Sequence, residues 1–524
     1  GFASSARLAS AASTSANAVP QGWEAVIGVE VHAQLRSKNK LFSSAPLPTP
    51  LSPPNSLVCG FDAALPGSLP RLSASALDKA LRACFALEAD VQLRSTWDRK
   101  HYFYPDLTSG WQITQKYAPL AVNGIVRLRA DEGQLGAGEE VDVLIEQVQL
   151  EQDTAKSQHY ISASSGGNET HIDLNRAGSA LVEIVSGPQL RSGEQAAAYV
   201  RKIQELLRRV GASDGNMDEG SLRCDVNVSV RRPDEPFGTR CEVKNLNSAR
   251  FVALAIGHEV SRQIATLERG ELVEQDTRGY DEATGTTFRL RSKADAPDYR
   301  YMPDPSLPPL VLTQETLDTA RASLPELPDA QRARLLRTYP DLSLRDINVL
   351  MRIGLEDDIA ASGSAVTVAD SVAYFEQVAC GRDPQVAMNW IIQDLLKALN
   401  QAVVSFSANP VAPEALAELI DLVAERQVTG TTARQLLAEL VCGEQKLPTG
   451  ATPVQQHLSS RGMLAMGGGS AGTEALDALL DEVVRDLPSA VAAVQAGKTK
   501  VLMRLVGEAM KRTQGRADAK AVKE

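Results

Sequence analysis

The amino-acid sequence predicts an α+β protein, with a mixed or antiparallel sheet in its first part and helices alone in its last part. Segments in which apolar and polar residues alternate strictly occur between about residues 24 and 309, together with helical patterns. From about Leu312 onward, leucine and alanine recur at helical spacing and few alternating segments remain. The prolines Pro305, Pro308 and Pro309 separate the two parts.

Length and charge narrow the class of protein further. A chain of 524 residues with 43% hydrophobic residues can form about two to four domains, each with its own core. The formal net charge of −11, from 54 basic and 65 acidic residues, argues against a protein that coats nucleic acid through bulk charge. The sequence holds no run of about 18 apolar residues, so we expect no transmembrane helix.

Residues 1–23 differ in composition from the rest of the chain. They are rich in alanine and serine, contain Arg7 and have no acidic residue before Glu24. This composition resembles the remnant of an organellar transit peptide, and a disordered tail is the alternative. We therefore exclude residues 1–23 from the predicted fold.

The segment Glu24–Leu35 alternates almost perfectly between apolar and polar residues and predicts a strand. Glu30 and His32 share its polar face, roughly 6.5–7 Å apart along the strand, because side chains alternate between the two faces. A carboxylate beside an imidazole on a rigid strand suits a divalent metal ion. A polar stripe that faces solvent is the alternative interpretation.

Two segments in the first part carry helical patterns. Arg71–Leu87 has apolar residues at three- and four-residue spacing, which predicts a helix. Ser192–Val210 predicts a second helix, because Ser192 and Gln195 form a capping-box pattern at its start and Gly211 follows its end. Helices and strands therefore share this part of the chain.

Two further carboxylates stand out between these helices. Glu183 lies within an apolar strand that would otherwise be fully buried. A buried carboxylate without a partner is costly, so Glu183 needs a cation or a hydrogen-bond donor. Glu151 follows two glutamines on one side of its predicted strand, although an exposed edge position is an equal alternative. Together with Glu30 and His32, the two carboxylates would form a ligand shell suited to Mg²⁺ or Mn²⁺.

Two later segments repeat the alternation with charged and amide side chains. Leu222–Arg231 and the residues after Arg240 are apolar at every second position. Their polar positions carry Arg223, Asp225, Asn227, Glu242 and Lys244, and the second segment runs into Asn245. Paired strands would place these side chains on one sheet surface, which predicts a floor for a phosphate-bearing ligand with metal ions. The sequence has no P-loop motif, so ATP would bind on the sheet face.

The C-terminal stretch Lys498–Glu524 is a candidate for local RNA binding in this acidic protein. It has eight Lys and Arg residues against three Asp and Glu residues. Lys500, Arg504 and Lys511 are spaced four and seven residues apart and would share one helix face. They predict a contact with RNA phosphates, and a solvated helix face is the alternative.

At these motifs the sequence resembles the B subunits of the glutamyl-tRNA(Gln)/aspartyl-tRNA(Asn) amidotransferases. The resemblance covers nearly everything after Trp23 and rests on motifs that follow one another along the chain. They are Ile27-Gly-Val-Glu-Val-His32, Asp98-Arg-Lys-His-Tyr-Phe-Tyr-Pro-Asp106, Asp173-Leu-Asn-Arg-Ala-Gly178, Ser213–Ser229, Gly238–Ser248, Asp298-Tyr-Arg-Tyr-Met-Pro303 and Gly507–Gly515. Several collinear motifs of nine or more residues are far more than chance would give.

The resemblance implies an organisation and an activity. It implies a cradle-shaped catalytic domain over residues 24–310, a helical domain over residues 311–400, and a tail domain over residues 401–524 that binds tRNA through Lys500, Arg504 and Lys511. The expected partners are an amidase, the A subunit of the enzyme, which releases ammonia from glutamine, and a small C subunit. The B subunit would use ATP to phosphorylate the glutamate misacylated on tRNA(Gln), and ammonia would then displace phosphate. We expect this ligase in the mitochondrial matrix or a plastid, without membrane association.

The resemblance also implies roles for single residues. The metal ligands would be His32, Glu151 and Glu183, with Glu30 near a second ion. The segment Asp98–Asp106 corresponds to the ammonia passage and the pocket entrance. The expected catalytic residues are Glu151, Glu183, Lys100 and Asp106. The expected ATP- and acceptor-binding residues are Arg223, Asp225, Asn227, Glu242, Lys244 and Asn245.

Departures from the family pattern limit these expectations. Gln152 stands where the family often has a second glutamate, and Gly187 stands where an acidic residue usually precedes the proline. Ser43 and Ser44 replace the first cysteine pair of some bacterial members, and the six cysteines form no Cys-x-x-Cys pair. We therefore expect Mg²⁺ or Mn²⁺ with ATP as co-substrate, and no structural zinc.

Two other functions stay open at this point. The chain could be a noncatalytic tRNA-binding scaffold of the same kind of complex, although the surviving polar residues argue against that. A stand-alone ligase is weakened because no glutaminase nucleophile or amidase signature is found. The sequence leaves undecided whether tRNA(Asn) is served as well as tRNA(Gln), and whether the small third component of the complex is present.

Overall fold

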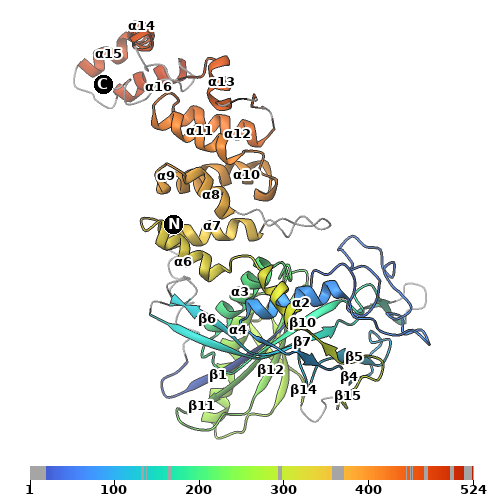
Figure 1. Cartoon of the computed structure of the whole chain (residues 1–524). Helices are drawn as coiled ribbons and strands as arrows, with labels where there is room; N and C mark the ends of the chain where they lie inside the picture. The colour runs from blue at the N-terminus through green and yellow to red at the C-terminus, as the bar shows by residue number, and fades with distance from the viewer. Residues whose placement is uncertain are drawn as a thin grey trace. The chain divides into compact units, whose positions relative to one another are not determined.

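The computed structural model describes residues 19–130, 135–136, 138–161, 167–292, 298–356, 371–443, 445, 447–448, 450, 452–464, 470–495, 501–512 and 522. Most of the predicted N-terminal segment, and Lys500, lie outside these residues. The chain divides into two compact units, Gly1–Ala333 and Arg334–Glu524 (Figure 1). In the parts that are described, no helix is both long and apolar enough to cross a membrane.

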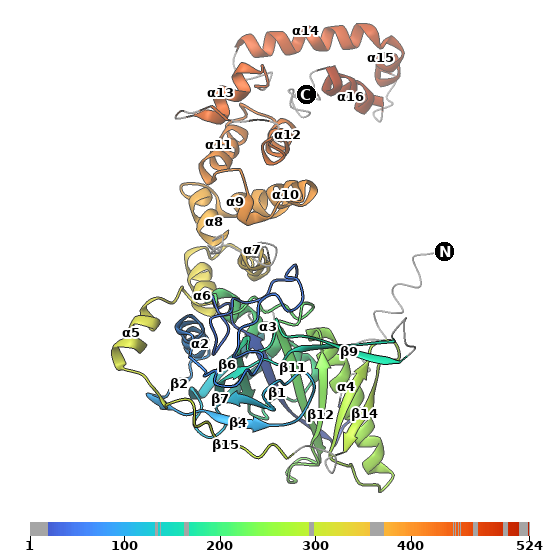
Figure 2. The ribbon, with the colours of Figure 1, turned by 90° about the vertical axis from the view of Figure 1, so that its right-hand side faces the viewer.

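A nine-stranded mixed sheet forms the centre of the first unit (Figure 2). The strands are β1 (Glu24–Gln34), β2 (Asp90–Val91), β6 (Ala121–Arg129), β7 (Glu140–Gln152), β10 (Ala180–Ser186), β11 (Leu222–Arg231), β12 (Cys241–Leu246), β13 (Asp276–Asp281) and β14 (Thr286–Ser292). Their order is β14-β13-β12-β11-β1-β10-β7-β6-β2, and only the β12–β13 pair is parallel. Strand β1 therefore lies between β10 and β11.

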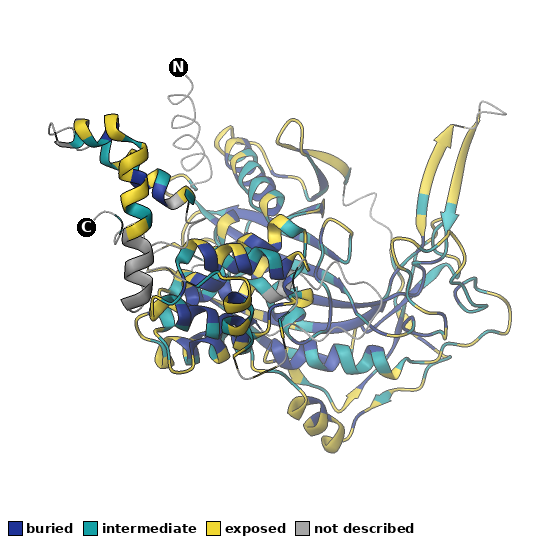
Figure 3. Ribbon diagram, turned by 90° about the horizontal axis from the view of Figure 1, so that it is seen from above, coloured by how far each residue is buried: buried dark blue, intermediate teal, exposed yellow. Residues whose placement is uncertain are grey.

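Smaller sheets accompany the large one. One consists of β15 (Met302–Pro303), β4 (Asp98–His101) and β5 (Trp111–Thr114); a second pairs β16 (Leu310–Val311) with β3 (Arg94–Ser95); a third pairs β8 (Lys156–Ile161) with β9 (Asn168–Asp173). Strands β8 and β9 form a largely exposed ribbon (Figure 3). Strand β5 contacts β7, so the first small sheet adjoins the large sheet.

Helices cover one face of the large sheet and bury its apolar side chains. They are α2 (Ala74–Ala86), α3 (Gly193–Arg209) and α4 (Ala249–Glu268), followed by α5 (Gln314–Ala322). Helix α3 packs on β1 and β6, and α4 packs on β11, β12 and β14. Ile27, Val29 and Val31 of β1 are at most 1% exposed and belong to the core that these helices complete. The opposite face of the sheet keeps its polar side chains.

The second unit is helical. Helix α6 (Pro328–Thr338) crosses the boundary between the units, and the later elements are α7 (Leu344–Glu356), α8 (Ser371–Ala379), α9 (Pro384–Asn389), the π-helix η4 (Trp390–Leu395), α10 (Leu396–Ala402), the 3₁₀ helix η5 (Phe406–Ala408), α11 (Pro413–Ala424), α12 (Gly430–Val441), α13 (Pro453–Ser460), α14 (Ser470–Asp486), α15 (Pro488–Gln495) and α16 (Leu502–Arg512). A core of its own joins α7 to α13. The subdivision of this unit near residue 400 stays a prediction.

The predicted fold class is confirmed, and the predicted elements are found close to their expected bounds. The three alternating segments are β1, β11 and β12, and the two helical patterns are α2 and α3. Ser192 caps α3 by accepting a hydrogen bond from the backbone N–H of Gln195 at 3.1 Å. The capping box is incomplete, because the Gln195 side chain accepts from the N–H of Arg191 and not from that of Ser192.

Candidate active site

Three neighbouring strands bring charged side chains together on the polar face of the large sheet. His32 of β1 lies opposite Glu183 of β10 on one side and Arg223 of β11 on the other. Glu30 lies opposite Asp225. Residues that are directly opposite on antiparallel strands have their Cβ atoms about 4.5–5.5 Å apart, so this register makes the side chains neighbours.

Glu30, His32 and Glu183 form a compact cluster of possible metal ligands. One ligand atom from each lies within 4.8 Å of the others. Nε2 of His32 is 3.3 Å from Oε1 of Glu30. Glu183 is only 7% exposed, as its apolar surroundings predict. Two carboxylates and one imidazole are a donor set that Mg²⁺ or Mn²⁺ can use.

The charges in the cluster shift the pKa values of its members. Burial would lower the pKa of His32, but the hydrogen bond to Glu30 and the charges of Glu183, Glu30 and Glu151 outweigh it and raise the pKa to about 9. Burial, reinforced by the charge of Glu151, raises the pKa of Glu183. Burial opposes ionisation of Glu30, yet His32 holds the pKa of Glu30 well below its ordinary value. Without a cation, protons on His32 and Glu183 therefore balance the negative charge of the cluster. A divalent cation could take over this task.

Glu151 of β7 lies beside this cluster without belonging to its most compact part. The strand register places Glu151 opposite Leu181, one pleat along β10 from Glu183. Its carboxylate is 2% exposed, and Oε1 accepts a hydrogen bond of 2.7 Å from Nε2 of Gln112. Its other oxygen, Oε2, is buried without a hydrogen-bond partner among the described residues. A buried carboxylate oxygen of this kind fits a cation or a substrate group that supplies the missing partner.

Two glutamines that the sequence did not single out hold these carboxylates in place. Nε2 of Gln149 donates to Oε2 of Glu183 at 2.7 Å, which supplies the donor that the burial of Glu183 requires. Gln112, from β5 of the adjoining small sheet, donates to Glu151. Gln149 shares the polar face of β7 with Glu151, so the alternation could have identified it. Gln112 has no comparable signal, because β5 is a short and largely buried strand.

The predicted floor residues lie along β11 and β12, beside the cluster. Nζ of Lys244 is 2.6 Å from Oδ2 of Asp225 and 2.9 Å from Oε1 of Glu242. Asn227 lies opposite Glu242 in the strand register. Asn245 ends this row in a left-handed conformation, with φ of 63°, and its side chain is exposed. These side chains leave a polar surface of both charge signs next to the cluster.

Arg223 connects the floor to the carboxylates. Its Nη2 donates to Oδ2 of Asp153 at 2.8 Å, whereas its Nε is buried and lacks a hydrogen-bond partner in the described structure. Burial would lower the pKa of Arg223, but Asp153 and other nearby carboxylates raise it, so the guanidinium stays charged. A charged donor with one free N–H is suited to a phosphate oxygen.

Lys100 and Asp106, the two predicted catalytic residues of the 98–106 segment, differ in their surroundings. Nζ of Lys100 is 3.9 Å from Oε1 of Glu151. Burial would lower the pKa of Lys100, but Glu151 and Glu183 raise it, so the ammonium stays charged. Asp106 instead lines a cavity whose described lining includes none of Glu30, His32 and Glu183.

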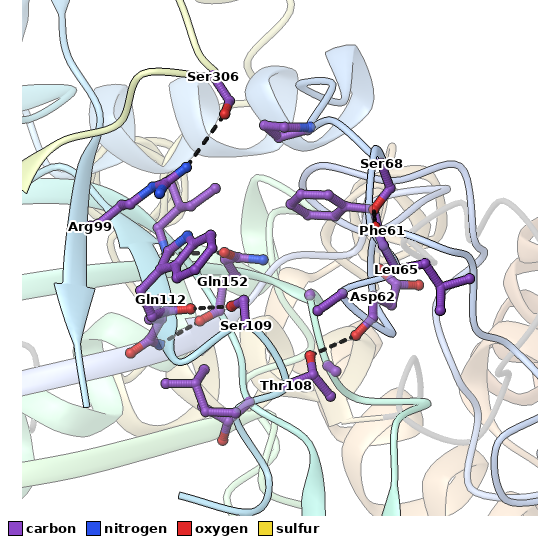
Figure 4. A pocket seen from close by; sticks show the side chains of 18 of the residues that line it. Phe61, Asp62, Leu65, Ser68, Arg99, Thr108, Ser109, Gln112, Gln152 and Ser306 are labelled. Carbon is purple, nitrogen blue, oxygen red and sulfur yellow. Dashed lines mark hydrogen bonds between the residues drawn. The ribbon is translucent and has the colours of Figure 1, made fainter. Parts of the chain in front are cut away.

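That cavity has a volume of about 270 Å³, and Arg99, Gln112 and Gln152 are among the residues that line it (Figure 4). Gln112 lines it and also donates to Glu151, so this side chain connects the cavity to the site. Arg99 reaches over the ring of Trp111, with its guanidinium carbon 4.0 Å from the ring centroid. Asp62, Asp106, Asp153 and Asp304 contribute four carboxylates to its lining.

The predicted tRNA-binding residues belong to the second unit. Arg504 and Lys511 are on α16, and both are exposed. Val506 of the same helix is 5% exposed, so the helix has one buried position between these two basic residues. Lys500 lies outside the described residues, so its place on this face, and the role of the face, stay predictions.

Known proteins resemble this chain over its whole length. A profile of the GatB/GatE catalytic domain matches residues 25–318, and a profile of the GatB domain matches residues 373–524. A mitochondrial protein of Mycosarcoma maydis, named as the B subunit of glutamyl-tRNA(Gln) amidotransferase, is 50% identical over 576 aligned residues, which cover 100% of this chain and 88% of that one. The protein of the same name from Laccaria bicolor is 46% identical over 96% of this chain and 91% of its own length. The B subunit of an aspartyl/glutamyl-tRNA(Asn/Gln) amidotransferase from Sinorhizobium medicae is 43% identical over 95% of this chain and 93% of its own length.

Proposed function

The chain belongs to the family of amidotransferase B subunits, and we propose from this premise that the polar face of its sheet activates the glutamate carboxylate carried on tRNA(Gln). The protein is the B subunit of a glutamine-dependent carbon–nitrogen ligase that serves translation in the mitochondrion. It acts on misacylated tRNA together with an amidase, the A subunit, and with a small C subunit, and the family uses ATP. The reaction yields Gln-tRNA(Gln).

Glutamate on tRNA(Gln) is the substrate that the relatives favour. The two mitochondrial relatives, at 50% and 46% identity, are named for glutamyl-tRNA(Gln) alone. The bacterial relative, at 43% identity, is named for both tRNA(Asn) and tRNA(Gln). We therefore infer that tRNA(Gln) is the main substrate and that tRNA(Asn) is not required.

The single observation that carries the proposed site is the cluster of Glu30, His32 and Glu183, whose ligand atoms lie within 4.8 Å of one another. These residues would hold Mg²⁺ or Mn²⁺, and the unpaired Oε2 of Glu151, on the neighbouring strand β7, is a further candidate ligand. A bound cation would neutralise phosphate charge as ATP is used. The chain offers its own cations for the same task in Arg223 and Lys100.

Lys100, Gln112 and Gln149 would orient the reacting groups and stabilise their charges. Lys100 keeps its ammonium charged beside Glu151, where it can stabilise negative charge that develops on a phosphoryl or carboxylate oxygen. Gln112 and Gln149 each fix one carboxylate by a hydrogen bond of 2.7 Å. Such preorganised groups need not rearrange when charge develops, which is the main protein contribution to phosphoryl transfer.

The cavity behind Gln112 is the proposed side from which ammonia arrives. It adjoins Glu151 through a single side chain, so a small neutral molecule held there would be close to the activated carboxylate. Asp106 lines this cavity, which gives it a role in passage and not in phosphoryl transfer. We propose no zinc for either place, because the described cysteines are scattered and make no group of ligands.

A noncatalytic scaffold would have no use for the unpaired groups at this face. Leaving a buried polar group without a partner costs about 1–3 kcal/mol, and more for a charged group. Both Oε2 of Glu151 and Nε of Arg223 are in this state. This cost is understandable where a cation and a phosphate complete the hydrogen bonding, and it favours the enzyme.

The test is ATP hydrolysis and amidation by the intact complex with Glu-tRNA(Gln). We expect ATP hydrolysis that depends on the misacylated tRNA and on Mg²⁺, and amidation that high ammonium can drive in place of glutamine. A Glu183→Gln variant should lose the ammonium-driven reaction, whereas a Glu169→Gln variant on the exposed ribbon should keep it. Full ammonium-driven activity of Glu183→Gln would remove Glu183 from the proposed site.

A further inference from the structure

Five tyrosines from three distant segments form a continuous row beside the candidate active site. They are Tyr104, Tyr102, Tyr299, Tyr301 and Tyr117. Successive ring centroids are 5.7, 5.9, 6.0 and 6.2 Å apart, and every contact is edge-to-face. The whole sequence has only ten tyrosines, so half of them gather in this one place. We call this set the tyrosine row.

The tyrosine row is a surface feature and not part of the hydrophobic core. Its two end members, Tyr104 and Tyr117, are 54% and 69% exposed, and none of the five belongs to the core clusters. The three middle members, Tyr102, Tyr299 and Tyr301, are half-buried. The row therefore offers exposed rings at both ends and partly accessible rings between them, and aromatic side chains with one apolar and one polar end are common at binding surfaces.

Two lysines lie over the rings. Nζ of Lys100 is 5.1 Å from the ring centroid of Tyr299, and Nζ of Lys116 is 5.9 Å from that of Tyr301. A surface in which cations alternate with aromatic faces combines phosphate binding with base stacking. A partner protein surface would instead favour rings with few cations between them, since lysine is depleted in protein interfaces.

The tyrosine row leads directly to the carboxylates. The hydroxyl of Tyr102 donates to Oε1 of Gln112 at 2.9 Å, and Gln112 donates in turn to Glu151. Lys100 contacts both the row and Glu151. Both connections start from Tyr102 and Tyr299, inside the row. A nucleic-acid chain that approached over Tyr117 and Tyr301 and ended on these two rings would therefore have its end close to Glu151.

We propose that the tyrosine row binds the unpaired nucleotides at the 3′ end of the tRNA by stacking on their bases. This inference rests on the proposed function, which requires the aminoacyl end of a tRNA to reach Glu151 and Glu183. Unpaired bases stack on aromatic side chains without regard to sequence, as a single-stranded end that is common to all tRNAs requires. The two lysines bind the intervening phosphates. The net acidic protein would thereby hold the 3′ end of a polyanion through a local surface.

The test uses the intact complex with ammonium as nitrogen source, so that the amidase contributes nothing to the rate. Tyr301→Leu and Tyr117→Leu each remove a ring, Tyr301→Phe keeps the ring, and Tyr160→Leu removes a half-exposed tyrosine from the β8–β9 ribbon as a matched control. We expect each row-to-leucine change to raise the KM for Glu-tRNA(Gln) by about tenfold, the loss of one stacked base. The KM for ATP should stay the same, and Tyr301→Phe and Tyr160→Leu should behave as wild type.

A direct readout accompanies the kinetics. The fluorescence of a 2-aminopurine placed at the terminal adenine of the tRNA should be quenched on binding to wild type, and less so on binding to Tyr301→Leu. Unchanged tRNA KM and unchanged quenching in both leucine variants, at unchanged melting temperature, would overturn the proposal. A defect seen with glutamine but not with ammonium would also overturn it, because the row would then contact the amidase. If wild type failed to amidate at all, the proposed function would fall, whereas quenching would still decide the stacking.

Discussion

Binding of Mg²⁺ to the metal-free protein should release protons, and the number released should fall as the pH rises. The pKa of His32 is about 9, because its hydrogen bond to Glu30 and the surrounding carboxylates outweigh its burial. A group with this pKa is about 99% protonated at pH 7 and about half protonated at pH 9. A metal ligand must be deprotonated, so His32 alone should release about one proton at pH 7 and about half a proton at pH 9. Glu183, whose pKa is also raised, adds to the release at neutral pH.

The proton number can be measured by titration calorimetry of the intact complex with Mg²⁺, in two buffers that differ in heat of ionisation. We expect between one and two protons per ion at pH 7, and an apparent affinity that increases with pH. His32→Gln should lower the proton number by about one and weaken binding, because it removes both the proton and the ligand. His159→Gln, on the exposed β8–β9 ribbon, is the matched control and should match wild type.

A proton number below about half at pH 7 for wild type would refute the reasoning, since His32 would then be neutral before the ion arrives. An unchanged proton number in His32→Gln would refute it as well, because the protons would then come from elsewhere. Either result would also remove the main electrostatic argument for a cation site at this cluster.

Three other sets of contacts give measurable expectations. Without Mg²⁺, the contribution of His32 to the free energy of unfolding should be present below pH 6.5 and be lost as the pH rises through about 9, because the pKa of His32 in the folded protein lies above its ordinary value. This contribution is about 3 kcal/mol. Thermal melting between pH 6 and pH 9, with and without Mg²⁺, measures it. Lys40→Met should destabilise the first unit by about 3–5 kcal/mol, because Lys40 and Asp62 form a fully buried ion pair of 2.9 Å. The double variant with Asp62→Asn should recover part of the loss in melting temperature, because it leaves no unpaired buried charge. Replacing both Arg504 and Lys511 by glutamine should raise the KM for tRNA and weaken its dependence on salt concentration, without changing the KM for ATP. If the salt dependence of the KM for tRNA did not change, α16 would have only a structural role.

The fold was predictable where one strand or helix alone carries the signal. Strands β1 and β11 were predicted within a residue or two because an apolar and a polar face alternate along each of them. Helices α2 and α3 were predicted from their apolar stripes and from the capping serine of α3. The strand order was not predictable, because β1 pairs with β10 and β11, which lie about 150 to 200 residues further along the chain, and register between distant strands is set by the tertiary fold.

Some residues of the candidate site could likewise be predicted from a single strand, whereas others are brought together only by the fold. Glu30 and His32 could be placed together because they share one face of one strand. Glu183 could be singled out because a carboxylate in an apolar strand needs a partner, but its donor, Gln149, is on a different strand. Gln112 gives no local signal. The tyrosine row, likewise, is assembled from segments around residues 104, 117 and 300, so it exists only in the folded chain.

Two buried polar atoms of the candidate site lack hydrogen-bond partners among the described residues, and they belong to different strands. Oε2 of Glu151, on β7, is a buried acceptor without a donor, and Nε of Arg223, on β11, is a buried donor without an acceptor. They lie on opposite sides of the strand pair β10–β1, which carries Glu183 and His32. In a folded protein with no ligand, the cheaper arrangement would pair such groups with each other. Their separation across β10 and β1 matches the proposed site, in which a cation would lie on the side of Glu151 and a phosphate on the side of Arg223. The proposed metal ion with a nucleotide phosphate would satisfy both groups at once, which neither a metal alone nor an RNA phosphate alone would do.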